Sequence, residues 1–247
     1  DATDVAKAFQ ALGLKTELVQ DVGRDAMFAA LEKFKAAAQG ANLAAFYFAG
    51  HGAFWEKETY LVPEDADLAN PNNVQSFVSA GAINEASRQA RHRLLVFDNC
   101  RNNPADGWRQ REALITANVT KFTAASAALN GPNTLVLFST APGRVAVDGP
   151  SGANSPFAAM FLRQLSGGAV DLQALPGRLR RDLLVATEGQ QLVWEQTTFN
   201  QPYVVSRAAA SADPVRPGAE MQIVEMDKAY AFARANGLML PDGLVAV

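Results

Sequence analysis

The fold is decided by the run LLVFDNC at residues 94–100, in which four apolar residues lead into a polar end that carries Cys100, the only cysteine of the chain. A second run, AFYFAGHG at residues 45–52, leads in the same way into His51 between two glycines. Continuously apolar runs are typical of strands that helices cover on both faces, and open α/β sheets place reactive groups at the carboxyl ends of such strands. A thiol and an imidazole at these two ends favour a cysteine–histidine hydrolase.

Strands and helices alternate along the rest of the domain, which predicts an α/β fold with a mainly parallel central sheet and helices on both faces. Apolar residues at helical spacing predict helices over residues 3–12, 24–38, 80–90, 155–165 and 171–187. Ser155 followed by Pro156, a cap residue before a proline at the first helical position, predicts the start of the fourth of these helices. Shorter apolar runs predict further strands at residues 16–19, 59–62, 134–139 and 203–206.

Length and composition limit the organisation of the chain. With 247 residues, 49% of them hydrophobic, it can form one large domain, or one domain with an appendage. The composition changes after Ala208, so we expect a domain over residues 1–206 and a linker with a C-terminal helical extension over residues 207–247. A net charge of −3 predicts no general attraction to nucleic acid, and no apolar run approaches the length of a membrane span.

The cysteine and histidine counts bear on redox state and on metals. A single cysteine excludes an internal disulfide and leaves a free thiol, which favours the cytoplasm, with the periplasm as the alternative because catalytic thiols also occur there. Two histidines and one cysteine are too few for a zinc site, so no metal site is predicted.

The segments around these residues resemble the caspase and metacaspase family. Residues 48–52 (FAGHG) are similar to the histidine motif of that family, residues 98–101 (DNCR) to its cysteine motif, and residues 139–143 (STAPG) to a further caspase segment. The motif NCRNNP at residues 99–104 looks most like that of bacterial caspase-like peptidases of the orthocaspase type. The resemblance covers residues 1–206 and implies a caspase-like three-layer fold.

The resemblance also implies a division of catalytic labour. Cys100 would attack the scissile carbonyl as the thiolate, and His51 would deliver a proton to the leaving amine. The oxyanion would be held by the backbone N–H groups of Gly52 and Cys100. No third catalytic residue is assigned.

Two rival functions stay open at this point. One is a non-catalytic scaffold with the same fold, although such proteins usually lose the cysteine or the histidine. The other is an esterase or transamidase that uses the same pair. A strand-forming segment at residues 144–147, with Ala146 and Val147, favours a peptide substrate instead, because it can pair with an extended chain.

Departures from the caspase pattern predict a substrate pocket of reversed charge. Caspases hold aspartate with a glutamine two residues before the cysteine and an arginine after the Pro-Gly segment. Here the corresponding positions are Asp98 and Asp148, and Asp1 resembles an aspartate of the metacaspase pocket. Carboxylates would attract arginine, which they can hold in bidentate fashion, or lysine. The sequence therefore predicts cleavage after arginine.

The long polar stretch after the nucleophile contains Arg109 and Arg111, which lie where caspases are cut during maturation. An enzyme with a preference for arginine would be able to cut itself there. Activation by calcium stays open as an alternative to a cofactor-free enzyme, although no aspartate-rich cluster in the sequence marks a clear calcium site. Glu64, Asp65 and Asp67 are better interpreted as an exposed acidic turn than as calcium ligands.

One expected element is missing. Caspase-like folds normally begin with a central strand before the segment that Asp1 resembles, and this sequence begins at that segment. Buried neighbours without that strand would carry unpaired backbone groups. We therefore expect an N-terminal segment or a second chain to complete the sheet.

Overall fold

The computed structural model describes residues 1–55, 58–67, 70–99, 129, 131–141, 146–147, 149–150 and 152–207. The chain divides into two units, Asp1–Ala212 and Asp213–Val247, and every described residue lies in the first. The expected boundary near residue 206 and the extension after it therefore stay predictions. Within the described ranges, no helix has the length and apolar character needed to cross a membrane.

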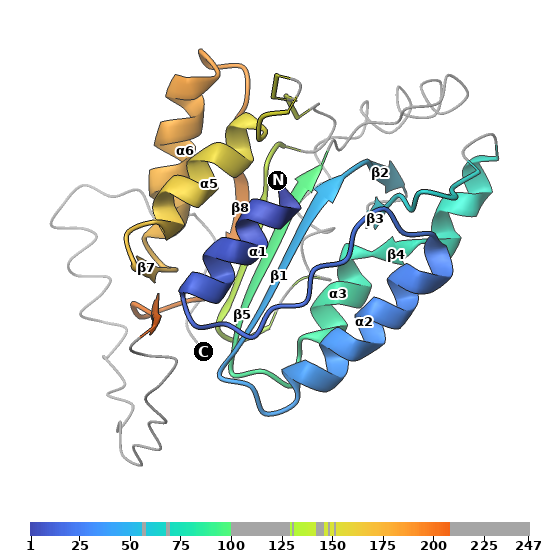
Figure 1. The fold of residues 1–247 in the computed structure, drawn as a ribbon, viewed down its shortest axis with the longest axis horizontal. Coiled ribbons are helices and arrows are strands. Elements are labelled where there is room, and N and C mark those ends of the chain that lie inside the picture. The colour runs from blue at the N-terminus through green and yellow to red at the C-terminus, as the bar shows by residue number, and fades with distance from the viewer. Residues whose placement is uncertain are drawn as a thin grey trace, which may run out of the picture. The chain divides into compact units, whose positions relative to one another are not determined.

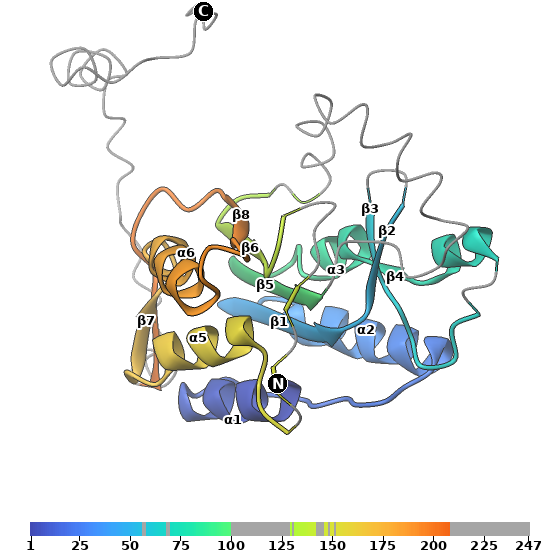
Figure 2. The same cartoon turned by 90° about the horizontal axis from the view of Figure 1, so that it is seen from above.

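The central sheet has four strands in the order β1-β5-β6-β8 (Figures 1 and 2). Strands β1 (Leu43–Gly50), β5 (His92–Asn99) and β6 (Thr134–Phe138) run parallel to one another, and β8 (Trp194–Thr197) pairs with β6 in the antiparallel direction. The mainly parallel sheet expected from the sequence is therefore confirmed.

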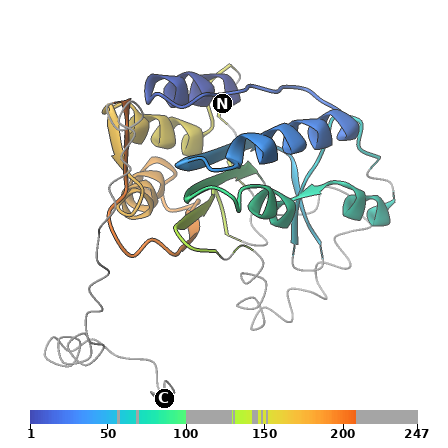
Figure 3. The same cartoon turned by 90° about the horizontal axis from the view of Figure 1, so that it is seen from below.

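Helices cover this sheet on both faces, as Figures 2 and 3 show. Helices α1 (Ala2–Ala11), α5 (Pro156–Leu165) and α6 (Leu175–Ala186) contribute to the core on one face. Helices α2 (Arg24–Ala38) and α3 (Ala80–Ala86) contribute to the core on the other. The result is the three-layer arrangement that the alternating sequence predicts.

The packing of β5 between two helical layers explains why its sequence is continuously apolar. Leu94 and Val96 lie in the core with α1, α5 and α6, whereas Leu95 and Phe97 lie in the core with α2 and α3. Because side chains alternate along a strand, both faces need apolar residues here. Asp98 continues the alternation toward the first of these cores.

Two small sheets accompany the central one. Strands β2 (Gly52–Trp55), β3 (Glu58–Leu61) and β4 (Val78–Ser79) form an antiparallel sheet directly after β1, next to the 3-10 helix η1 (Pro71–Ser76). Strands β7 (Ala169–Asp171) and β9 (Val204–Ser206) form an antiparallel pair. The predicted strand at residues 203–206 is therefore real but lies outside the central sheet.

Two further expectations about elements were wrong in part. Helix α3 ends at Ala86 and not near residue 90, and α6 begins at Leu175 because residues 169–171 pair with β9 instead. Strands β2, β4, β7 and β8 were not predicted at all.

Residues 16–19 were predicted to be a strand and form none. No described strand pairs with them, and Leu18 and Val19 are each 40% exposed. A strand needs a partner for its backbone groups, so an apolar run without one stays irregular. Similarly, β1 stands at the edge of the sheet and most of its residues are only half-buried.

Candidate active site

The carboxyl ends of β1 and β5 lie side by side. The two strands pair in parallel with Gly50 opposite Asn99 and Ala49 opposite Asp98. His51 follows this pair directly along the chain. The two apolar runs that the sequence analysis identified therefore end side by side at the carboxyl ends of the parallel strands, where α/β folds hold their reactive groups.

His51 lies between the last residue of β1 and the first residue of β2 and belongs to neither strand. Gly50 has a φ of +158°, and a Cβ atom there would lie 3.0 Å from Cζ of Phe48, so glycine suits the position. The backbone carbonyl of His51 accepts a hydrogen bond of 3.0 Å from the N–H of Val62, just after β3. His51 is exposed, and Gly52 is buried at the start of β2. The His51 side chain is thus exposed to solvent, while a hydrogen bond from Val62 holds its backbone.

Several predicted site residues fall outside the described residues. These are Cys100, Asp148 and the proposed self-cleavage residues Arg109 and Arg111. The last described residue before the cysteine is Asn99, which is buried at the end of β5.

Asp98 holds a buried carboxylate at this edge. Its Oδ2 atom accepts a hydrogen bond of 2.6 Å from the hydroxyl of Ser155 and one of 3.2 Å from the hydroxyl of Tyr47. Burial raises the pKa of Asp98 above its ordinary value, and the hydrogen bonds from Ser155 and Tyr47 act in the opposite direction. Burial also raises the pKa of Tyr47, with the nearby Asp98 charge adding to the effect.

Asp1 lies beside the same serine. Its Oδ1 atom accepts a hydrogen bond of 2.8 Å from the backbone N–H of Ser155. Ser155 is the N-cap of α5, and its Oγ atom accepts from the N–H of Ala158 at 2.9 Å. One cap residue therefore brings Asp1 and Asp98, two of the three predicted pocket acids, to the amino end of a helix, where negative charge is favoured.

A second contact supports the position of the N-terminal residues. The side-chain amide of Asn154 donates a hydrogen bond of 3.0 Å to Oδ2 of Asp4. This bond is the main reason that the pKa of Asp4 lies below its ordinary value, with Lys7 adding to the effect. The start of α1 is thus tied to the residues before α5 at two points.

The segment predicted to pair with a peptide is hydrogen-bonded to Gln191, a buried residue. The backbone N–H of Val147 donates a hydrogen bond of 3.0 Å to Oε1 of Gln191, and Nε2 of Gln191 donates one of 2.8 Å to the carbonyl of Ser139. Ala146 is buried, whereas Val147 is 37% exposed. Val147 therefore presents side chain to solvent while its amide is fixed to the interior.

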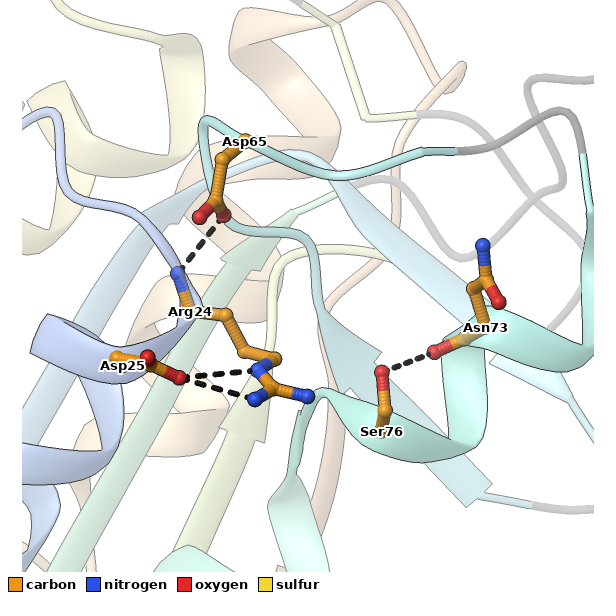
Figure 4. Close-up of polar contacts among 5 residues, drawn as sticks. All are labelled: Arg24, Asp25, Asp65, Asn73 and Ser76. Atoms are coloured by element: carbon orange, nitrogen blue, oxygen red, sulfur yellow. Dashed lines mark hydrogen bonds and ion pairs between the residues drawn. The ribbon is translucent and has the colours of Figure 1, made fainter.

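The acidic turn has a structural task. Oδ1 of Asp65 accepts a hydrogen bond of 2.8 Å from the backbone N–H of Arg24, the first residue of α2 (Figure 4). A Cβ atom on Gly23, which precedes Arg24, would lie 2.5 Å from Asp65. Asp67 accepts from the amide of Asn73. Across the described ranges, no three His, Cys, Asp or Glu side chains gather in a way that could hold a metal ion.

Sequence reasoning missed three residues around the predicted site: Tyr47, Ser155 as a partner of the acids, and Gln191. Ser155 before Pro156 predicts a helix cap, but its second role depends on Asp98, 57 residues earlier, and no local pattern marks that contact. Tyr47 stands two residues before Ala49, on the face of β1 that Asp98 occupies in β5. No local pattern marks Gln191, because its partners lie 44 and 52 residues away.

Comparisons with known proteins place the chain in a family. A family model of the caspase domain matches residues 1–204. The chain is similar in fold to the crystal structure of caspase-1 from Spodoptera frugiperda, with a TM-score of 0.53 and 14% sequence identity over 83% of this chain and 79% of that one. No curated protein matches the chain.

Proposed function

Because the chain belongs to the caspase domain family and is thus a cysteine-type peptidase domain, we propose that it is an endopeptidase that cleaves after arginine, and also lysine. Cys100 is the nucleophile of this proposal and His51 its proton carrier. The observation that carries it is the pairing of Gly50 with Asn99. Each catalytic residue follows one member of that pair by a single peptide unit, which spans about 3.8 Å between Cα atoms.

The chemistry follows from these two groups. The Cys100 thiolate forms a C–S bond with the scissile carbonyl carbon, and the displaced electron pair moves to the carbonyl oxygen. Backbone N–H groups of Gly52 and Cys100 bind that oxyanion. The C–N bond then breaks as His51 gives its proton to the leaving amine. Water, losing a proton to His51, hydrolyses the thioester and restores the thiolate.

The preference for arginine rests on Asp98 and Asp1, with Asp148 as a third member. The first two carboxylates meet at Ser155, at the edge of the sheet where β1 and β5 end. A guanidinium stays protonated at any ordinary pH and can engage a carboxylate through two N–H groups. An aspartate side chain would instead be repelled by the same charges. This arrangement supports a pocket for a basic residue.

A panel of peptide substrates that differ only at the residue before the cut tests the proposal. We expect turnover of the arginine peptide, weaker turnover of the lysine peptide, none of the aspartate peptide, and complete loss in Cys100→Ala. Since the proposal includes no cofactor, a chelator such as EDTA should leave the rate unchanged. Preference for aspartate would refute the pocket, and a wild-type chain that binds peptides without cutting them would favour a scaffold.

We also propose that the enzyme processes itself after Arg109 or Arg111. Both residues lie between β5 and β6, whose pairing joins the two sides of such a cut. Intact mass after incubation should show two fragments for the wild type and one uncut chain for Cys100→Ala. Identical single masses for both would overturn this part of the proposal.

A further polypeptide segment, from the same protein or from a second chain, is proposed to pair with β1. Among the described residues, β1 pairs only with β5, and the nearby residues 16–19 find no strand partner. Hydrogen exchange on the protein isolated from its natural source tests this idea. Uniform protection of the amides of residues 43–50 is expected. Alternating fast and slow exchange, typical of an edge strand, would contradict it.

A further inference from the structure

Gln191 is a buried polar residue whose two amide ends serve two distant backbone groups. It is 1% exposed. Oε1 accepts from the N–H of Val147, and Nε2 donates to the carbonyl of Ser139. A buried amide is costly unless it is hydrogen-bonded, and here both ends are used. The side chain therefore acts as a link between two segments that are not neighbours in sequence.

The end of α6 holds Gln191 itself in place. The backbone N–H of Gln191 donates to Oγ1 of Thr187 at 3.0 Å, and that hydroxyl donates to the carbonyl of Leu183 at 2.8 Å. The chain reverses here through Glu188 and Gly189, whose φ angles are +50° and +83°. A side chain anchored in this way can hold its partners at a fixed distance from the helix.

Ser139 connects the link to the proposed pocket. Its backbone N–H donates a hydrogen bond of 2.9 Å to the carbonyl of Phe97, which extends the β5–β6 ladder to the residue just before Asp98. Gln191 thus joins Val147, through Ser139, to the same strand end that carries Asp98 and leads to Cys100. Any shift of Val147 relative to the end of β5 would therefore change its position relative to Asp98 and Cys100.

We propose that Gln191 is a positioning residue for the peptidase, which fixes the register of the segment at Ala146 and Val147 relative to the reacting groups. This inference rests on the proposed function, in which that segment pairs with the extended backbone of the substrate. A peptide bound one step out of place would bring the wrong carbonyl to Cys100, and misplacement of this kind is costly in rate. Gln191 does not touch the substrate itself.

The test compares two arginine substrates with the same leaving group. One is an acylated tetrapeptide that ends in arginine, and the other is acylated arginine alone, which is too short to pair with the segment. In Gln191→Met, which keeps the side-chain volume but loses both hydrogen bonds, kcat/KM for the tetrapeptide should fall about tenfold, mainly through kcat. For acyl-arginine it should stay within about twofold of the wild type.

A matched control separates positioning from general stability. Gln164→Ala removes a hydrogen bond of 2.8 Å between Gln164 on α5 and Asp182 on α6, away from the segment. This variant should keep the wild-type ratio between the two substrates. The rate at which iodoacetamide alkylates Cys100 should be equal in all three proteins, because that reagent needs no peptide-pairing segment.

The outcomes distinguish this inference from the proposed function. If the wild type cleaves neither substrate, the proposed function fails and the inference falls with it. If the wild type prefers the tetrapeptide and a folded Gln191→Met keeps the same ratio, only the positioning role is refuted. Should Gln191→Met show no cooperative thermal transition, Gln191→Asn, which keeps the amide but is too short to reach both partners, is judged by the same ratio.

Discussion

Ser155 and Asp98 are joined by a hydrogen bond of 2.6 Å that ties the start of α5 to the end of β5. The same hydroxyl oxygen accepts from the N–H of Ala158, so it both caps a helix and satisfies a buried carboxylate. Helix and strand are therefore held together by a single oxygen atom, at the edge where the catalytic residues are proposed to act.

Replacing that oxygen should cost more than an ordinary helix cap. In Ser155→Ala the helix loses its cap and Asp98 loses a donor, so the free energy of unfolding should fall by about 2 to 3 kcal/mol. Ser79→Ala is the matched control, because Ser79 caps α3 through a bond of 3.1 Å to Ala82. That change should cost about 1 kcal/mol. Urea denaturation measures both, and equal losses would contradict a shared role for Ser155.

Asp65 caps α2, and two substitutions at this position should change the free energy of unfolding by different amounts. Because its carboxylate accepts from the N–H of Arg24, Asp65→Ala should lower the free energy of unfolding by about 1 kcal/mol. Asp65→Asn keeps an oxygen acceptor and should change it by only a few tenths of a kcal/mol, since asparagine caps well. Thermal or urea unfolding decides the matter. Similar losses in both variants would point to the charge of Asp65 and away from its hydrogen bond.

Patterns within single elements were visible in the sequence. The apolar run of β5 predicted a doubly covered strand, and Ser155 before Pro156 predicted the start of α5, because both signals depend on neighbouring residues alone. Residues 16–19 show the opposite case. Their apolar pattern is that of a strand, yet strand formation depends on a partner that the local sequence does not specify.

The same difference between local patterns and long-range partners applies to the residues of the site. His51 could be placed because it follows an apolar run, and the register of β1 with β5 then decides what it faces. Tyr47 and Gln191 could not be placed, because their roles come from partners far away in sequence. The acidic turn was correctly described as a turn, but its function as a cap depends on the position of α2, 41 residues earlier.

His92 should make stability depend on pH near neutrality. Its ring stacks on Tyr203 with a centroid distance of 3.8 Å, and burial lowers its pKa below the ordinary 6.5. The unfolded state then binds more protons than the folded state below pH 6.5, so stability is lost as the pH falls through that value toward the lowered pKa.

The variant His92→Phe retains a stacking ring and removes the proton site. The difference in unfolding free energy between it and the wild type should therefore change between about pH 8 and pH 5, to the disadvantage of the wild type. A pH-independent difference between His92→Phe and the wild type would refute this role of His92.

Tyr47 should set the pH at which the pocket accepts arginine. Its hydroxyl donates to Asp98 and opposes the rise in pKa that burial causes, so Tyr47→Phe should raise the pKa of Asp98 further. Only the ionised carboxylate attracts a guanidinium. The acidic limb of kcat/KM for an arginine peptide should therefore move to higher pH, while the values at high pH converge with those of the wild type.

Two controls make this prediction specific. Tyr203→Phe removes a hydroxyl from the ring that stacks on His92 and should leave the limb in place. The pH profile for alkylation of Cys100 by iodoacetamide should be the same in Tyr47→Phe and the wild type, because it reports on the thiol and not on the pocket. If the acidic limb stays unchanged while the protein remains folded, the Asp98 carboxylate does not bind the arginine of the substrate.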